Sequence, residues 1–251
     1  MNGPHDVHFD YERYASRLLD GGRRQEVLSW KADVLSAIVP AGYAFDSALE
    51  IGCAEGIVLA RLGELLHIKR CVGLDVSETF LSYGRSLYPH IDFRLTRSKT
   101  LPFPDQSIDL IILSDIIEHV QDVSLFLQEV RRVGRYILVK LPMEQHWWRK
   151  YISLPLGRAP RTGRHHPDGH LHIFTRRSFL NVIQSMGFGV ITNSVRYYFN
   201  NFPYTFPNRL VKIRWTLDRF LKTHFPGWAH LVFGGMLFVF ARTTGTGTRF
   251  L

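Results

Sequence analysis

A glycine-containing segment and an acid on the following predicted strand have the residue types of a nucleotide site. The stretch SALEIGCAEGIVLARLG, residues 47–63, carries Glu50, Gly52 and Gly56 where an apolar run gives way to a helical pattern. Glycine allows a sharp turn and a close approach of ligand to backbone, and a helix that begins near Gly56 presents free N–H groups. Asp75 closes the next apolar run, where a carboxylate can accept both hydroxyls of a ribose. These residues predict a site for a nucleotide-like cofactor.

A second group of residues combines carboxylates with imidazoles. The segment DIIEH places Asp115, Glu118 and His119 on about one helical turn, and His170 follows in GHLHIFT. Carboxylate and imidazole ligands suit a divalent cation, so these four residues are candidate metal ligands. Asp115 and His119 are also the candidate catalytic residues. The alternative is that no metal binds, that Glu118 holds a local hydrogen bond, and that His119 packs or acts as a base.

Short apolar runs alternate with amphipathic segments along most of the chain. The pattern predicts an α/β fold with a doubly wound, mostly parallel, seven-stranded Rossmann-like sheet. Ligands of such sheets bind beyond the carboxyl ends of the strands. We therefore expect one crevice to be lined by residues 52–56, Asp75, the pair Arg97 and Ser98, and residues 114–119.

The domain organisation predicted from the sequence is a single domain, residues 1–251. An N-terminal helical cap (1–40) precedes the cofactor-binding core (41–142). Two insertions, 143–174 and 198–230, follow predicted strands and are rich in aromatic and basic residues, so we expect them to cover the substrate side of the crevice. Residues 243–251 are expected to form a flexible tail.

Composition limits the classes of partner and compartment. The net charge is +9 and the pI is about 9.8, which favours an anionic partner such as RNA, an acidic lipid surface or a phosphorylated molecule, unless the chain is simply basic. The two cysteines are too few for a disulfide scaffold and indicate a reducing compartment. With no leader segment and no apolar run long enough to span a bilayer, we expect a cytoplasmic protein, with peripheral membrane contact left open.

The segments described above resemble the class I S-adenosylmethionine-dependent methyltransferases. The resemblance is to the branch with ubiquinone- and menaquinone-pathway enzymes and small-molecule O-methyltransferases, and it covers residues 45–142 well and 168–190 moderately. It implies that S-adenosyl-L-methionine is the cofactor and that its binding residues are Glu50, Gly52, Cys53, Gly56, Asp75, Val76, Arg97, Ser98 and Ser114. Two positions depart from the pattern: Ala54 replaces the usual middle glycine, and Arg97 stands where an acid is common. A dinucleotide-binding oxidoreductase is the alternative for the glycine segment.

The resemblance implies an in-line displacement in which the nucleophile, the methyl group and the sulfur must be aligned and water excluded. Three functions remain open. The first is O-methylation of a small-molecule or lipid-like acceptor. The second is RNA 2′-O-methylation, because the four candidate metal ligands are similar to the Glu-x-x-Glu-His plus distant His set of small-RNA 2′-O-methyltransferases, with Asp115 one methylene shorter than the first Glu. The third is a non-catalytic cofactor-binding partner subunit.

Overall fold

The computed structural model describes residues 15, 24–143, 170–196, 220, 224 and 235–244. Most of the two predicted insertions, most of the predicted tail and the first part of the N-terminal cap lie outside these residues. The domain boundaries therefore stay predictions.

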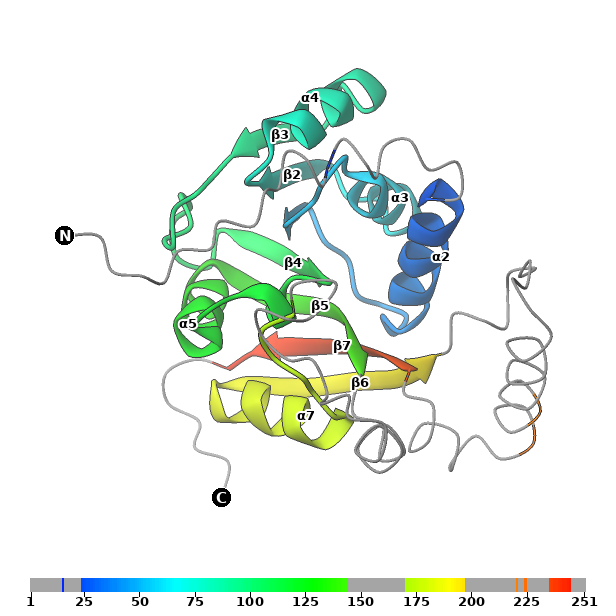
Figure 1. The fold of residues 1–251 in the computed structure, drawn as a ribbon, viewed down its shortest axis with the longest axis vertical. Coiled ribbons are helices and arrows are strands. Elements are labelled where there is room, and N and C mark those ends of the chain that lie inside the picture. The colour runs from blue at the N-terminus through cyan, green and yellow to red at the C-terminus, as the bar shows by residue number, and fades with distance from the viewer. Residues whose placement is uncertain are drawn as a thin grey trace, which may run out of the picture.

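The described strands form one seven-stranded sheet with the order β3-β2-β1-β4-β5-β7-β6 (Figure 1). The first five strands in this order pair in parallel, and β7 runs antiparallel to both of its neighbours. This confirms the predicted fold class. The strands are β1 Ser47–Ile51, β2 Arg70–Asp75, β3 Asp92–Leu95, β4 Ile108–Ser114, β5 Gly134–Met143, β6 Phe188–Arg196 and β7 Gly235–Thr243.

Three of the described helices begin after a residue whose side chain caps them. The side chains of Ser77, Asp122 and Thr175 accept hydrogen bonds from the first turns of α4, α5 and α7 respectively, which satisfies N–H groups that have no partner within the helix. The helices among the described residues are α2 Arg24–Ala37, α3 Ile57–Leu65, α4 Glu78–Leu87, α5 Val123–Val133 and α7 Arg176–Ser185, and the 3₁₀ turn η1 spans Ile117–His119.

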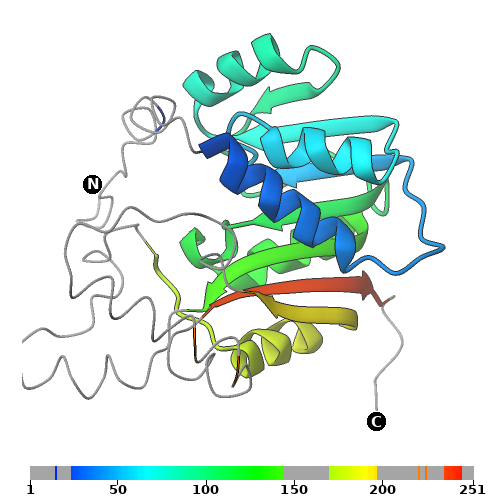
Figure 2. The same cartoon turned by 90° about the vertical axis from the view of Figure 1, so that its right-hand side faces the viewer.

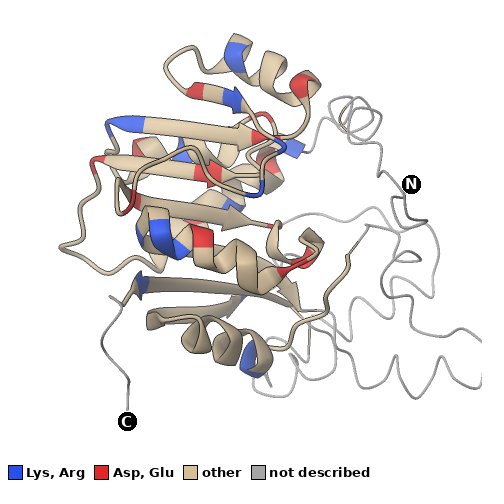
Figure 3. Cartoon of the chain, turned by 90° about the vertical axis from the view of Figure 1, so that its left-hand side faces the viewer, with Lys and Arg blue, Asp and Glu red and all other residues tan. Residues whose placement is uncertain are grey.

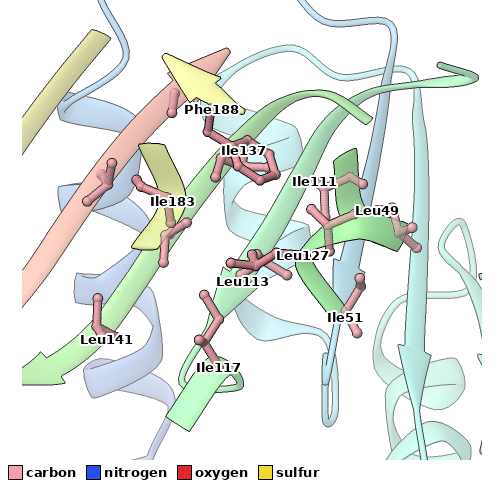
Figure 4. Close-up of a cluster of buried hydrophobic side chains, with 14 of the residues drawn as sticks. Leu49, Ile51, Ile111, Leu113, Ile117, Leu127, Ile137, Leu141, Ile183 and Phe188 are labelled. Atoms are coloured by element: carbon pink, nitrogen blue, oxygen red, sulfur yellow. The ribbon is translucent and has the colours of Figure 1, made fainter. Parts of the chain in front are cut away.

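The side chains of the central strands alternate between two hydrophobic cores. One core joins β1, β4 and β5 to α5 and α7, and Figure 4 shows Leu127 and Ile183 of these helices beside Ile111 and Ile137 of the sheet. The other core joins the opposite face of the sheet to α2 and α3, which lie in front of it in Figure 2. Strands that are buried on both faces need nearly continuous apolar sequence, as β4 has.

This topology brings the carboxyl ends of four parallel strands to one edge of the sheet. The loops that follow β1, β2, β3 and β4 begin there, at residues 52, 76, 96 and 115. The candidate site is built from these loops.

Candidate functional site

The glycine segment forms a tight turn that is anchored to β2. Gly52 and Gly56 have φ angles of 73° and 79°, in the left-handed region that favours glycine. The backbone N–H groups of Gly52 and Cys53 donate to the carbonyl oxygen of Leu74 at 2.8 and 3.0 Å. The turn is therefore held against the end of the neighbouring strand.

The two glycines also make room for side chains of the protein itself. A Cβ at Gly56 would lie 2.5 Å from Cζ of Phe93, and one at Gly52 would lie 2.9 Å from Cδ1 of Ile116. Ligand approach is the reason that we expect for these glycines from the sequence, and the structure adds packing as a second reason. Ala54, between them, also has a left-handed φ of 48°, which is the conformation the more usual glycine would adopt more easily.

Asp75 ends β2 and ties two loops together. Its Oδ2 accepts a hydrogen bond from the backbone N–H of Ala54 at 2.8 Å, and its Oδ1 accepts one from the N–H of Ser77 at 2.9 Å. Burial raises the pKa of Asp75, and these backbone donors oppose the rise. Each carboxylate oxygen can accept more than one hydrogen bond, so the arrangement leaves acceptor capacity for the two hydroxyls of a ribose.

Glu50 is a buried acid on β1 whose side chain is only partly satisfied. It is 2% exposed, and its Oε2 has no hydrogen-bond partner among the described residues. Burial raises its pKa well above the ordinary value. A buried polar atom without a partner requires an explanation, and a cationic or N–H-bearing ligand group at this edge of the sheet would supply one.

The other residues expected to bind the cofactor lie at the same edge. Val76 and Ser114 are half-buried at the ends of β2 and β4, and the backbone N–H of Thr96 donates to the carbonyl oxygen of Asp75 at 2.9 Å. Arg97 and Ser98 follow Thr96 and are exposed. The fold thus gathers these positions, while their contacts with a cofactor stay predictions.

The carboxylate of Asp115 is held by two lysines. Its Oδ2 accepts from Nζ of Lys31 in α2 at 2.6 Å, and its Oδ1 accepts from Nζ of Lys140 in β5. Burial raises the pKa of Asp115, but Lys140 and Lys31 outweigh burial and hold this pKa below its usual range. At neutral pH the Asp115 carboxylate is therefore ionised and accepts hydrogen bonds from both lysines, which makes it a weak proton acceptor.

The remaining three candidate metal ligands do come together. One donor atom each from Glu118, His119 and His170 lie within 4.8 Å of one another, and the two imidazole rings meet edge to face with their centroids 4.8 Å apart. Asp115 does not belong to this cluster, and metal binding by the predicted set stays a prediction. The left-handed φ of 58° at Asp115 and its ion pairs direct its carboxylate to the lysines.

The cluster is held by the segment that precedes α7. The backbone N–H groups of Leu171 and His172 donate to the carbonyl oxygen of Glu118 at 2.8 and 3.1 Å. Neither carboxylate oxygen of Glu118 has a hydrogen-bond partner among the described residues, and the residue is 1% exposed. Burial, followed by the charge of Asp115, raises the pKa of Glu118 to about 7.

Sequence reasoning missed the basic residues that α2 and β5 bring to the site. Arg24 forms a two-point ion pair with Glu55, which is 1% exposed in the glycine turn. Lys140 interrupts the apolar run that starts at Tyr136 in β5, and Lys31 lies at helical spacing from the buried residue Leu35. A charge within a buried pattern is the signal that could have found both lysines.

The sheet order and the positions of these loops define the class I, Rossmann-like methyltransferase fold. The family model described as a methyltransferase domain matches residues 49–136. A Mycolicibacterium smegmatis protein named "Probable S-adenosylmethionine-dependent methyltransferase" is 35% identical over 97 residues, which cover 38% of this chain and 37% of that protein. Residues 49–136 are therefore similar to a methyltransferase domain, and the named relative is of the S-adenosylmethionine-dependent class.

Other similar proteins agree with this class. The Bartonella tribocorum ubiquinone biosynthesis O-methyltransferase is 29% identical over 92 residues, 34% of this chain and 35% of that enzyme. The chain spans about a third of the length of the curated relatives it matches.

Solved structures resemble the chain over more of its length, at identities that show the fold alone. A chain in the complex between the Haloferax volcanii Trm112 methyltransferase activator and a methyltransferase has a TM-score of 0.69 at 17% identity, with 95% of this chain and 100% of that chain covered. A SAM-dependent methyltransferase from Aquifex aeolicus has a TM-score of 0.57 at 15% identity, with 93% and 98% covered.

Proposed function

We propose that the protein transfers a methyl group from S-adenosyl-L-methionine to a hydroxyl oxygen of a small-molecule or lipid-like acceptor. The observation that carries the proposal is the arrangement around Asp75, whose buried carboxylate closes β2 and bonds to the glycine turn at Ala54. The ubiquinone biosynthesis O-methyltransferase among the relatives supports oxygen as the target atom.

The described residues have distinct tasks in this proposal. Asp75 accepts the ribose hydroxyls, and the unpartnered Oε2 of Glu50 accepts from the amino group of the methionine part. The bound cofactor supplies an activated methyl group on a sulfonium. The protein aligns the acceptor with that methyl group and keeps water away from it. His119, half-buried after β4, is the proposed proton acceptor, since the two lysines on Asp115 make that carboxylate a poor one.

Calorimetry with S-adenosylhomocysteine tests the cofactor site. We expect Asp75→Ala to weaken binding about 100-fold, because two hydrogen bonds to a charged group are lost. Asp92→Ala is the matched control, since Asp92 is an exposed acid on β3 that pairs with Arg94. Equal affinity of Asp75→Ala and the unaltered protein would reject the ribose role.

Turnover is tested with an isotope-labelled methyl donor in cell extracts, followed by mass spectrometry of the products. A labelled small molecule or lipid supports the proposal. Cofactor binding without any labelled product would instead favour the third function, a non-catalytic partner subunit.

The cluster of Glu118, His119 and His170 favours a second candidate function, metal-assisted RNA 2′-O-methylation. One carboxylate and two imidazoles within 4.8 Å fit a divalent metal, and the buried Glu118 carboxyl without a partner fits a ligand role. When bound, the metal would orient and acidify the acceptor hydroxyl.

Chelation tests the metal-assisted function. We expect excess chelator to abolish methylation of RNA, and His170→Ala to have the same effect, while His90→Ala, an exposed histidine after α4, has none. Full activity in excess chelator would remove this candidate.

A further inference from the structure

Three charged side chains from three elements meet where β4 and β5 end. Lys31 extends from α2, Asp115 follows β4, and Lys140 lies on β5. The Asp115 carboxylate bonds to the ammonium groups of both lysines, and its backbone N–H donates to the carbonyl oxygen of Lys140 at 3.0 Å. We call Lys31 and Lys140 the lysine pair.

The lysine pair is placed where the fold would otherwise put apolar residues. Strand residues alternate between faces, so Lys140 shares the α2 face of the sheet with Leu138, which belongs to the core there. The side chains of Lys140 and Lys31 are 4% and 14% exposed. Burying an ammonium group is expensive unless it is paired, and two such groups against one carboxylate are not explained by stability.

Two basic side chains share one carboxylate in this cluster, that of Asp115. Burial lowers the pKa of Lys140, and the nearby charge of Asp115 opposes this effect. Glu118 is the other acid whose charge acts on Lys140. The Asp115 side chain is 27% exposed, so the cluster is open to an entering molecule.

We propose that the lysine pair binds an oxyanion, a carboxylate or phosphate group, on the methyl acceptor, and so selects an anionic acceptor molecule. The inference rests on the proposed methyltransferase function and names its substrate class. An ammonium group has three N–H donors. Bonds to Asp115 use one from each lysine, so donors remain for a second anion. An acceptor fixed there is held near the end of β4, where Asp115 and His119 lie.

Calorimetry on protein saturated with S-adenosylhomocysteine tests the selection with matched probes: phenyl phosphate against phenol, and benzoate against benzamide. We expect each anion to bind at least about 10-fold more tightly than its neutral counterpart. Lys31→Gln should abolish this preference and Lys31→Arg should retain it. Asp115→Asn should increase it, because a competing negative charge is removed.

The control is Lys69→Gln, which removes the same charge from an 80% exposed lysine beside the amino end of β2. We expect this variant to keep the full preference for anions. Lys31 is chosen over the more buried Lys140 because its replacement on a helix is compatible with folding.

The outcomes separate this inference from the proposed function. Normal binding of S-adenosylhomocysteine with no preference for anions would overturn the inference and leave the methyltransferase proposal standing. A loss of S-adenosylhomocysteine affinity in Lys31→Gln, with the anion preference unchanged, would also overturn it, since the lysines would then serve the carboxylate of the cofactor. Failure of the unaltered protein to bind S-adenosylhomocysteine would reject the proposed function itself.

Discussion

Four acids near the carboxyl edge of the sheet differ in their partners and therefore in their ionisation. Asp75 is supported by backbone N–H donors, and Asp115 is bonded to two lysines. Glu50 and Glu118 are buried, and their side chains have oxygens without hydrogen-bond partners among the described residues. Carboxyl groups thus differ in role here, because the environment sets the proton affinity of each. That of Asp75 joins two loops, that of Asp115 pairs with lysines, and those of Glu50 and Glu118 are candidate ligands.

The raised pKa of Glu118 predicts a pH-dependent stability. Its pKa of about 7 in the folded protein lies above the ordinary 4.5, so the folded state holds this proton more tightly. The free energy of unfolding therefore falls as the pH rises from about 4.5 to about 7, and it stays reduced above that. In the presence of chelator, Glu118→Gln should be more stable than the unaltered protein at pH 8 by an amount on the order of 3 kcal/mol, and similar to it at pH 5.

Urea unfolding at the two pH values measures this difference. Glu64→Gln, which changes an exposed acid on α3, should show no such dependence. A stability difference for Glu118→Gln that is the same at pH 5 and pH 8 would contradict the raised pKa.

At the scale of elements, the site depends on how α2 and α4 pack against the loops of the sheet. Helix α2 is joined by ion pairs to the glycine turn, through Arg24, and to the end of β4, through Lys31. Helix α4 approaches the turn so closely that a Cβ at Gly84 would lie 2.9 Å from the carbonyl oxygen of Glu55. The turn after β1 is therefore fixed from two sides by helices distant from it in sequence.

The glycine turn provides a test of this packing. Gly56→Ala should lower the free energy of unfolding by about 3 kcal/mol, because a left-handed φ disfavours a side chain and the new Cβ meets Phe93. Gly42→Ala is the matched control, with a φ of 91° but no atom within 4 Å of the new Cβ, and should lose only about 1 kcal/mol. Equal losses in urea unfolding would show that backbone strain alone explains the glycine.

At the scale of the whole molecule, the net charge is +9, of which residues 143–174 contribute +3 and residues 198–230 contribute +4. On the face shown in Figure 3, acidic and basic residues of the described part are interspersed rather than gathered into a basic stripe. No helix among the described residues is both long and apolar enough to cross a membrane.

Binding measurements distinguish the proposed small acceptor from RNA. We expect purified protein to carry no RNA, judged by its ultraviolet absorbance ratio, and its affinity for RNA to be weak at physiological salt. Tight binding with a steep, linear dependence of log affinity on log salt would instead show that several phosphates are contacted. That result would move the RNA function ahead of the small-molecule one.

The sequence by itself determined the local structure at the edge of the sheet where the candidate site lies. Alternating apolar runs predicted the strands, and Gly52, Gly56 and Asp75 marked the loops, because each of these signals acts between neighbours in the chain. The tertiary structure alone decided the partners of the acids. Lys31 lies 84 residues from Asp115 in the chain, and no pattern of spacing predicts such a contact. The packing of α2 and β5 places Lys31 and Lys140 against Asp115, and this carboxylate therefore lies outside the cluster of Glu118, His119 and His170. Such contacts arise only in the folded molecule.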